Sequence, residues 1–356
     1  MERKVTENLS DAETLLRRKP DIGVIPVRPK AYELKRPDFG KDATLILERH
    51  HSNPIMKVQD YPGIAQIYNP APVQYNGQTI LLVSVVRHAG KRGYGRDVGE
   101  THIARSNDGV KFELEGESWI DVPTSEYPYA LCHHFIDNRV TRIDDWYYII
   151  TPVMIHGFAS PVGMLGRTRD FKTYERMDII TQPPNRGASL FPEKISGKYW
   201  KLDRPGGGDG SGGDIWISSS PDLLHWGGFK PVIASGYRFW NMNKIGPTPP
   251  VRTTEGWLDI VHGVFSPAGG TYYYIGAILL DLEQPWKVIG KTNSYLLKPD
   301  MNYERVGNCD NTVFPCGVVA DYEKDEIRLY YGAADSCICL ATGRLSAIVA
   351  ACIKEI

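Results

Sequence analysis

The chain has 356 residues, of which 42% are hydrophobic and 11% aromatic, and its formal net charge is -1. This length allows one large domain or two ordinary ones with a sizeable core. The near-zero charge argues against a dedicated nucleic-acid binder, which would carry a basic excess. The sequence contains no run of about 18 apolar residues, so it predicts no membrane-spanning helix. The aromatic content suits a β-rich fold, and it also suits stacking on sugar rings.

The beginning of the chain predicts one helix over residues 10–18. Ser10 is a suitable N-cap, Asp11 follows in the first turn, and Pro20 ends the pattern. These first residues lack the apolar stretch of a secretory signal, so we expect a cytoplasmic protein with reduced cysteines. We expect residues 1–60 to form an extension with a short helix, which packs on the remaining domain or on a neighbouring subunit of a homo-oligomer.

After Tyr61 the pattern changes to short alternating apolar runs that are separated by Gly, Asn and Asp turns, and this indicates β-strands. The runs recur as a unit of three strands. The first strand of each unit ends in a turn and covers Ile67–Gly77, His133–Asp145, Gly187–Gly197, Lys244–Gly256 or Asn311–Lys324. The second is more strongly apolar and covers Thr79–Val86, Trp146–Met154, Lys198–Leu202, Trp257–Val264 or Ile327–Gly332. The third covers Thr101–Arg105, Val162–Arg167, Asp214–Ser218, Tyr273–Leu280 or Cys337–Ala341.

Five such units predict an all-β fold, a five-bladed β-propeller over residues 61–356, with a β-sandwich or an open β-solenoid as alternatives. In three copies the third strand runs into a turn with a central aspartate, namely Asp108, Asp170 and Asp222. Each carboxylate can fold back onto the backbone of its own turn. A closed propeller leaves a funnel along its axis, and we expect the site there.

Polar residues stand at corresponding places of successive units, where inner strands should be small and apolar. They are Asn69, Arg87, His88, Asp137, Asn138, Arg139, Asn185, Arg186, Asp203, Arg204, Lys244, His262, Asn311 and Asp335. Single residues have structural explanations: Asp137 can cap a turn, His262 can be a satisfied core histidine, and Arg204 can pair with Asp203. Because corresponding places converge on the propeller axis, the set as a whole predicts a functional site.

The charge balance of this set indicates a type of chemistry. Its carboxylates are mainly Asp137 and Asp335, whereas its cations are Arg87, Arg186, Arg204 and Lys244. An inverting glycosidase needs two carboxylates. A phosphorylase needs only the acid, because phosphate is the nucleophile, together with cations that hold the phosphate. The cationic excess therefore favours phosphorolysis, although the same cations would also suit an anionic sugar.

Three other patterns predict no site of their own. Cys337 and Cys339 share one face of a strand, and we expect small buried residues there, not a metal site. The segment Gly206–Gly213 lacks the Gly-Lys-Ser/Thr ending of a P-loop, so we expect a flexible loop. His133 and His134 have no metal-binding partner pattern.

The motifs of the chain resemble glycoside hydrolase family 130, the β-mannoside phosphorylases and related β-mannosidases. The resemblance extends from about Asn69 to Asp335 and covers most of the chain. It rests on Asn69-Pro70-Ala71, Ile136-Asp137-Asn138-Arg139-Val140, Leu190-Phe191-Pro192-Glu193-Lys194-Ile195, Arg204-Pro205, Lys244-Ile245-Gly246, Gly256-Trp257-Leu258, His262-Gly263-Val264, Leu279-Leu280-Asp281-Leu282, Val313-Phe314-Pro315-Cys316-Gly317 and Tyr330-Tyr331-Gly332-Ala333-Ala334-Asp335. That family adopts a five-bladed propeller, in agreement with the repeat.

The resemblance also implies roles for individual residues. Asp137 falls where the family places its catalytic acid, although this chain has Ile-Asp-Asn-Arg where the family usually has Glu-Asp-Pro-Arg. The phosphate-holding positions of the phosphorolytic members match Arg186, Arg204, Lys244 and Tyr273, and the hydrolytic members tend to lack those cations. The residues expected to bind the mannosyl unit are Asn69, Arg87, Asn138, His262 and Asp335.

The expected reaction is a reversible, inverting phosphorolysis of a β-linked mannoside to α-mannose 1-phosphate and a shortened acceptor. Asp137 would protonate the leaving oxygen directly or through a sugar hydroxyl, and neither a metal nor an organic cofactor is required. One alternative is an inverting β-mannosidase that uses water, with Asp335 or Glu126 as the second carboxylate. Another is a non-catalytic carbohydrate-binding propeller. The linkage, β-1,2 or β-1,4, and the acceptor sugar stay open.

Overall fold

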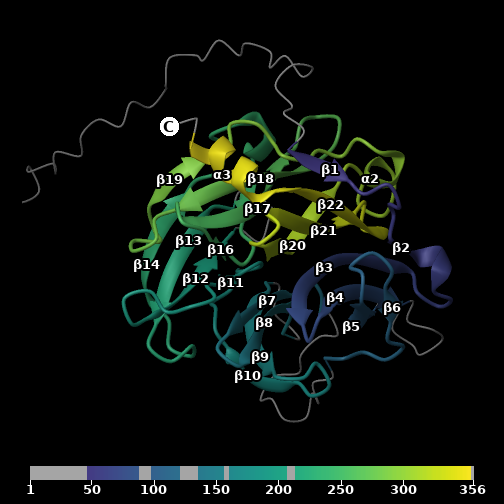
Figure 1. Ribbon diagram of the computed structural model, residues 1–356, viewed down its shortest axis with the longest axis horizontal. Coiled ribbons are helices and arrows are strands. Elements are labelled where there is room, and N and C mark those ends of the chain that lie inside the picture. Colours follow the sequence, from purple (N-terminus) through teal and green to yellow (C-terminus); the bar gives the residue numbers. More distant parts are fainter. Residues whose placement is uncertain (1–45, 88–97, 121–134, 156–159, 207–212, 354–356) are drawn as a thin grey trace, which may run out of the picture. The chain divides into compact units, whose positions relative to one another are not determined.

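The computed structural model describes residues 46–87, 98–120, 135–155, 160–206 and 213–353, which form five antiparallel sheets (Figure 1). Each sheet is one blade of a propeller. Blade 1 contains β3 (Gln66–Tyr75), β4 (Gln78–Arg87), β5 (Val98–Ser106) and β6 (Glu113–Leu114). Blade 2 contains β7 (Arg139–Ile143), β8 (Trp146–Val153), β9 (Val162–Thr168) and β10 (Glu175–Ile179). Blade 3 contains β11 (Ser189–Leu190), β12 (Tyr199–Asp203), β13 (Ile215–Ser220) and β14 (Gly227–Ile233).

The last two blades have additional short strands. Blade 4 contains β15 (Lys244–Gly246), β16 (Val251–Arg252), β17 (Trp257–Phe265), β18 (Tyr272–Leu280) and β19 (Val288–Lys291). Blade 5 contains β20 (Val313–Asp321), β21 (Glu326–Ala333) and β22 (Cys337–Arg344), together with β1 (Leu47–Arg49) and β2 (Met56–Lys57). The helices are short: 3-10 turns at Val58–Asp60 and Phe239–Asn241, α2 (Asn302–Arg305) and α3 (Leu345–Ile353).

Both faces of a blade are buried, because an apolar layer lies between each pair of neighbouring blades. Strand β4 shows how the sequence achieves this. Ile80 and Leu82 pack into the cluster shared with blade 2, whereas the alternate residues Leu81 and Val83 pack into the cluster shared with blade 5. Since successive side chains of a strand point to opposite faces, a strand with two buried faces needs an unbroken apolar run. This explains the long apolar runs of second strands such as β4 and β17, whereas β12 of blade 3 instead buries Lys201 and Asp203 as an ion pair.

The predicted five-bladed propeller is confirmed, and the three predicted strands of each unit are present. The fourth, outermost strand of each blade was not predicted. These strands are short or partly exposed, as in β6 with two residues and in β14, which has no buried residue. They therefore lack the apolar alternation by which strands are recognised.

The aspartate turns are also confirmed. The Asp108 carboxylate accepts the backbone N–H groups of Val110 and Lys111, both at 2.8 Å. The Asp170 and Asp222 carboxylates make the corresponding pairs of bonds two and three residues further on. A carboxylate that satisfies two turn amides fixes the path from the third to the fourth strand.

The two ends of the propeller unit meet in blade 5. Arg49 of β1 pairs with Ala341 of β22, and Met56 of β2 pairs with Ile338 of the same strand. The compact unit accordingly begins at Ala43. The boundary expected at residue 60 falls inside this unit, because two strands before it complete blade 5.

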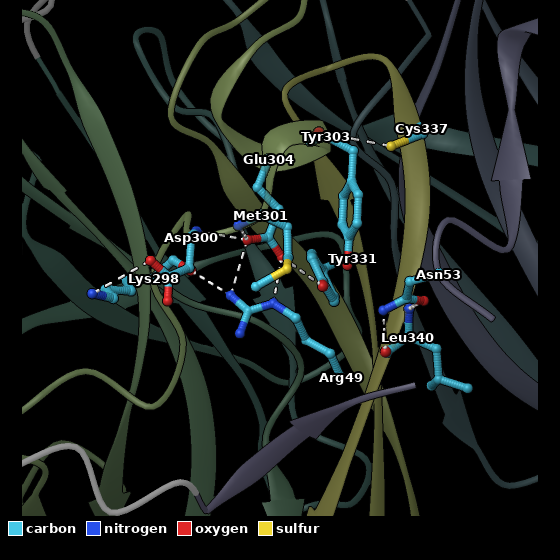
Figure 2. Close-up of polar contacts among 10 residues, drawn as sticks. All are labelled: Arg49, Asn53, Lys298, Asp300, Met301, Tyr303, Glu304, Tyr331, Cys337 and Leu340. Atoms are coloured by element: carbon cyan, nitrogen blue, oxygen red, sulfur yellow. Dashed lines mark hydrogen bonds and ion pairs between the residues drawn. The ribbon is translucent and has the colours of Figure 1, made fainter. Parts of the chain in front are cut away.

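Buried charge fastens the closing strand β1 to helix α2 (Figure 2). Arg49 Nε donates to Glu304 Oε1 at 2.8 Å, and Arg49 Nη2 donates to the Lys298 carbonyl oxygen at 2.7 Å. The fully buried Glu304 carboxylate also accepts the Tyr331 hydroxyl at 2.8 Å and the Asp300 backbone N–H at 2.7 Å. The charges of Arg49 and Glu304 are therefore paired with each other, as a buried ion pair requires.

Cys337 and Cys339 lie buried in the apolar layer between blades 4 and 5, as expected of small core residues. Among the described residues, no group of three or more His, Cys, Asp or Glu side chains is placed to hold a metal ion. None of the helices described is both long and apolar enough to cross a membrane. The predicted helix over 10–18, His88, Glu126, His133, His134 and the loop residues 207–212 lie outside the described residues.

Candidate functional site

The candidate site is built where the inner ends of the blades meet. The inner strand β3 contacts β7 of blade 2 and β20 of blade 5. Asn69, Asp137 and Asp335 all adopt the left-handed backbone region, with φ of 44°, 59° and 49°. This region is uncommon for residues other than glycine, and it persists only where the surrounding structure enforces it. Three of the predicted site residues therefore sit in sharply turned backbone.

Asp137 is the central carboxylate of the site and is 4% exposed. Its Oδ1 accepts Asn69 Nδ2 at 2.7 Å, and its backbone N–H donates to Ser84 Oγ at 2.9 Å. Its Oδ2 accepts Arg186 Nε at 3.0 Å and also Arg186 Nη2. Burial disfavours the charged carboxylate, but Arg186, the Asn69 hydrogen bond and Arg139 together lower the pKa of Asp137 below its ordinary value. Without a ligand, Asp137 is therefore an ionised partner of Arg186.

Arg204 lies beside Arg186, and its Nε donates to the Arg186 carbonyl oxygen at 2.7 Å. Burial and the neighbouring Arg186 lower the pKa of Arg204 to about 10. Burial, Arg204 and Arg186 lower the pKa of Lys244 to about 8. Within the part of the chain that the structure describes, no carboxylate pairs with Arg204 or Lys244. Arg204 and Lys244 thus add two unneutralised positive charges beside Arg186, and such an excess of positive charge favours an anion.

Gly246 allows the His262 ring and the Arg204 side chain to lie close to the backbone of β15. A Cβ atom at Gly246 would overlap the His262 ring and would lie 2.9 Å from Arg204 Cδ. The glycine of the Lys244-Ile245-Gly246 motif is therefore needed for packing between β15, β17 and the Arg204 segment.

His262 and Tyr273 form the aromatic side of the site. Their ring centroids lie 6.4 Å apart in a stacked arrangement, and Lys244 Nζ lies 5.9 Å from the centroid of the Tyr273 ring. His262 is 1% exposed, and neither ring nitrogen has a hydrogen-bond partner among the described residues. Burial and the nearby Arg204 hold the pKa of His262 well below its ordinary value, so the ring is neutral. A buried polar group without a partner requires an explanation, and a bound ligand supplies one.

Asp335 is the second carboxyl group near Asp137. Burial and the charge of Asp137 raise the pKa of Asp335 to about 7, although Arg186 opposes this effect. The two carboxyl groups therefore differ in character, because the pKa of Asp137 is lowered whereas the pKa of Asp335 is raised.

Eight of the ten predicted site residues are brought together in this way: Asn69, Asp137, Arg186, Arg204, Lys244, His262, Tyr273 and Asp335. Arg87 is not joined to them by any described contact. It donates to Glu100 Oε2 at 3.0 Å and to the Gly116 carbonyl oxygen at 3.0 Å. Asn138 is fully buried, donating to Thr101 Oγ1 at 2.8 Å and accepting from Thr151 Oγ1 at 2.6 Å. This geometry favours a supporting role for Asn138 over the substrate contact that we expected.

Two neighbours of the site were missed in the sequence. Tyr68 interacts electrostatically with Asp137, Asp335 and Arg186, and its position directly before Asn69 is the signal that could have identified it. Cys309 interacts with Tyr273, Lys244 and Asp335. No sequence signal marks Cys309, because it lies in an irregular segment between α2 and β20.

Fold and site together define a five-bladed propeller with a buried carboxylate, Asp137, beside the three cations Arg186, Arg204 and Lys244. The model of glycoside hydrolase family 130, described as beta-1,4-mannooligosaccharide phosphorylase, matches residues 43–354. The chain belongs to this family and is a carbohydrate-active enzyme.

Named relatives lie within the same family. The chain is 34% identical over 313 residues to a β-1,4-mannooligosaccharide phosphorylase from Ruminococcus albus, covering 85% of this chain and 90% of the relative. It is 31% identical to a 1,2-β-oligomannan phosphorylase from a Thermoanaerobacter strain, covering 83% and 96%. The structure of the β-1,2-mannobiose phosphorylase from Listeria innocua, in complex with β-1,2-mannobiose, is 26% identical. It matches with a TM-score of 0.77 over 87% of this chain and 99% of that one.

Proposed function

We propose that this enzyme transfers a mannosyl unit from a β-mannoside to inorganic phosphate, with inversion, giving α-mannose 1-phosphate and a shortened acceptor. The observation that carries this proposal is the group of cations at Arg186, Arg204 and Lys244. Only Arg186 among them has a carboxylate partner within the described residues. Water as a nucleophile would need no such group, whereas phosphate does. The relatives named as mannoside phosphorylases support the same function.

The proposed mechanism is a single displacement. Phosphate, held by the three cations and by the Tyr273 side of the site, attacks the anomeric carbon from the face opposite the scissile bond. As the C1–O bond breaks, Asp137 supplies a proton to the leaving oxygen, directly or through a sugar hydroxyl. The attacking hydrogen phosphate gives up its own proton as the new C1–O–P linkage forms, and this proton restores Asp137. The reaction therefore balances without a metal or an organic cofactor.

Arg186 links the two halves of this mechanism. In the unliganded site it pairs with Asp137 and keeps the carboxylate ionised. Phosphate competes with Asp137 for the same guanidinium group. As Arg186 shifts its hydrogen bonds toward phosphate, the pKa of Asp137 rises, and the carboxylate becomes able to carry a proton. Phosphate binding thus raises the pKa of Asp137 and favours the protonated form that acts as the general acid.

The test is to incubate the purified protein with β-1,2- and β-1,4-mannobiose, with and without phosphate, and to assay mannose 1-phosphate. Phosphate-dependent product supports the proposal and identifies the linkage, on which the relatives differ. Free mannose without phosphate would instead establish the hydrolase, for which Asp335 and Glu126 are the candidates for the second carboxylate. Binding of either sugar with no product would establish a non-catalytic propeller. Full activity after treatment with EDTA is expected.

A further inference from the structure

The two arginines of the site lie on separate segments of the chain that contact each other directly. Arg186 lies in the connection between β10 and β11, whereas Arg204 follows β12. Besides the bond from Arg204 Nε to the Arg186 carbonyl oxygen at 2.7 Å, Asn185 pairs with Pro205 in an isolated antiparallel bridge. The spacing of the two guanidinium groups therefore depends on how firmly the two segments are joined.

The side chain of Asn185 connects the two segments by hydrogen bonds. Its Nδ2 donates to Asp203 Oδ1 at 3.0 Å, and its Oδ1 accepts the Arg204 backbone N–H at 3.4 Å. Asn185 is 7% exposed. The Asn185 side chain thus binds both residues of the Asp203–Arg204 pair, and Asn185 is itself the residue directly before Arg186.

Asp203 is held in place by a buried ion pair. Lys201 Nζ donates to both carboxylate oxygens of Asp203 at 2.6 Å, because residues two apart on β12 share one face. Ser218 of β13 donates to Asp203 Oδ2 at 2.7 Å and accepts from Lys201 at 2.9 Å. The Lys201 and Asp203 side chains are 1% and 4% exposed. The carboxylate therefore has two acceptor bonds on each oxygen, and all three protons of the lysine are used.

Stability alone does not account for this arrangement. The desolvation of a buried ion pair offsets most of its attraction, and well-packed apolar residues can often replace such a pair without loss of stability. A positional role does account for it. A carboxylate next to Arg204 would compete with an incoming anion for the cations. Lys201 neutralises that charge, so Asp203 can accept from Asn185 without weakening the positive potential of the site.

On the basis of the phosphorolytic function proposed above, we propose that Lys201, Asp203 and Asn185 form a positioning network that fixes the spacing of Arg186 and Arg204 for phosphate. No described hydrogen bond or ion pair joins the side chains of Lys201, Asp203 or Asn185 to Asp137 or to the residues expected to hold the sugar. Its loss should therefore affect the phosphate half of the reaction selectively.

Asn185→Ala is the first test, because it removes the hydrogen bonds that join Asn185 to Asp203 and Arg204 and leaves the Lys201–Asp203 ion pair intact. A small misplacement of binding groups costs up to about 100-fold. We expect the KM for phosphate to rise by about 10- to 100-fold, with little change in the KM for mannobiose. Asn53→Ala is the matched control, since the Asn53 amide makes the same two-sided pairing with Leu340, at 2.8 Å for both bonds. This control should lower thermal stability and leave the KM for phosphate unchanged.

The double variant Lys201→Met with Asp203→Leu separates position from stability. It should unfold at nearly the same urea concentration as the native enzyme and should still show a raised KM for phosphate. Calorimetric titration with inorganic phosphate gives an independent readout. Failure of the native enzyme to bind phosphate would overturn both the proposed function and the network. Native binding that Asn185→Ala and the double variant retain undiminished would overturn the network alone.

Discussion

Replacing Asp137 by asparagine separates the two tasks of this carboxylate, proton donation and the pairing with Arg186. The amide has nearly the same shape and can keep a hydrogen bond with Asn69, so we expect the fold to be retained. General acid catalysis contributes about 10²–10⁴ in rate. Turnover of mannobiose with phosphate should fall by a factor in this range.

Phosphate affinity should change in the opposite direction. Two unit charges 4 Å apart attract each other by about 4 kcal/mol at an effective dielectric constant of about 20. This figure is an upper bound on the attraction to Arg186 that an incoming anion loses because Asp137 already pairs with the guanidinium group. The Arg186 side chain is 37% exposed, so solvent screens much of the attraction. A remaining effect of about 1.4 kcal/mol corresponds to phosphate binding that is about tenfold tighter in Asp137→Asn.

The assay combines steady-state formation of mannose 1-phosphate with calorimetric titration of inorganic phosphate. Asp222→Asn is the control, because Asp222 is a turn carboxylate of blade 3 that only organises its own loop. Turnover of Asp137→Asn that stays within about a factor of ten of the native value would refute the acid role. Weaker phosphate binding would refute the competition for Arg186.

Three further changes test other parts of the structure. The pKa of Lys244 is lowered to about 8, so its positive charge is lost as the pH rises through that value. The KM for phosphate should therefore increase above this pH in the native enzyme but not in Lys244→Arg. A native KM that stays constant across this pH range would contradict the prediction. Arg49→Met leaves the Glu304 charge buried and unpaired, which should cost about 3–5 kcal/mol in urea unfolding, and adding Glu304→Gln should restore most of the loss. Gly246→Ala should lower both thermal stability and phosphate affinity, because its Cβ would collide with the His262 ring; native values for both would show that the ring can move.

Much of the propeller was predictable because its second strands have two buried faces. A run such as Ile80 to Val86 allows neither a solvent-exposed face nor a helical stripe. The recurrence of the three-strand unit at five places then predicts a closed ring. The outer strands were not predictable, since β14 pairs with β13 through backbone bonds while its side chains stay partly exposed. The pairing of β1 with β22 was also not predictable, because no local pattern indicates a partner at the other end of the domain.

The site was predictable as a set of residues and not as a set of contacts. Recurrence at corresponding places identified Asn69, Asp137 and Arg204, because the ring geometry brings such places together. It could not show that Arg186 pairs with Asp137, since that depends on the side-chain conformation of a residue 49 positions away. For the same reason the sequence could not show that Arg87 turns toward Glu100 instead.

The closure of blade 5 has a consequence for the order in which this protein is made. The bond from Asn53 to Leu340 joins residues that are 287 positions apart, and β2 pairs with β22 in the same place, so neither contact can form until β22 has been made. A ribosome that adds about 5–20 residues per second needs roughly 15 to 60 s to make the intervening chain. Blades 1 to 4 can form on the nascent chain during this time, while β1 and β2 wait without a partner. A chain that stops before β22 therefore exposes unpaired strand edges at its beginning, where a chaperone or protease can recognise an unfinished product.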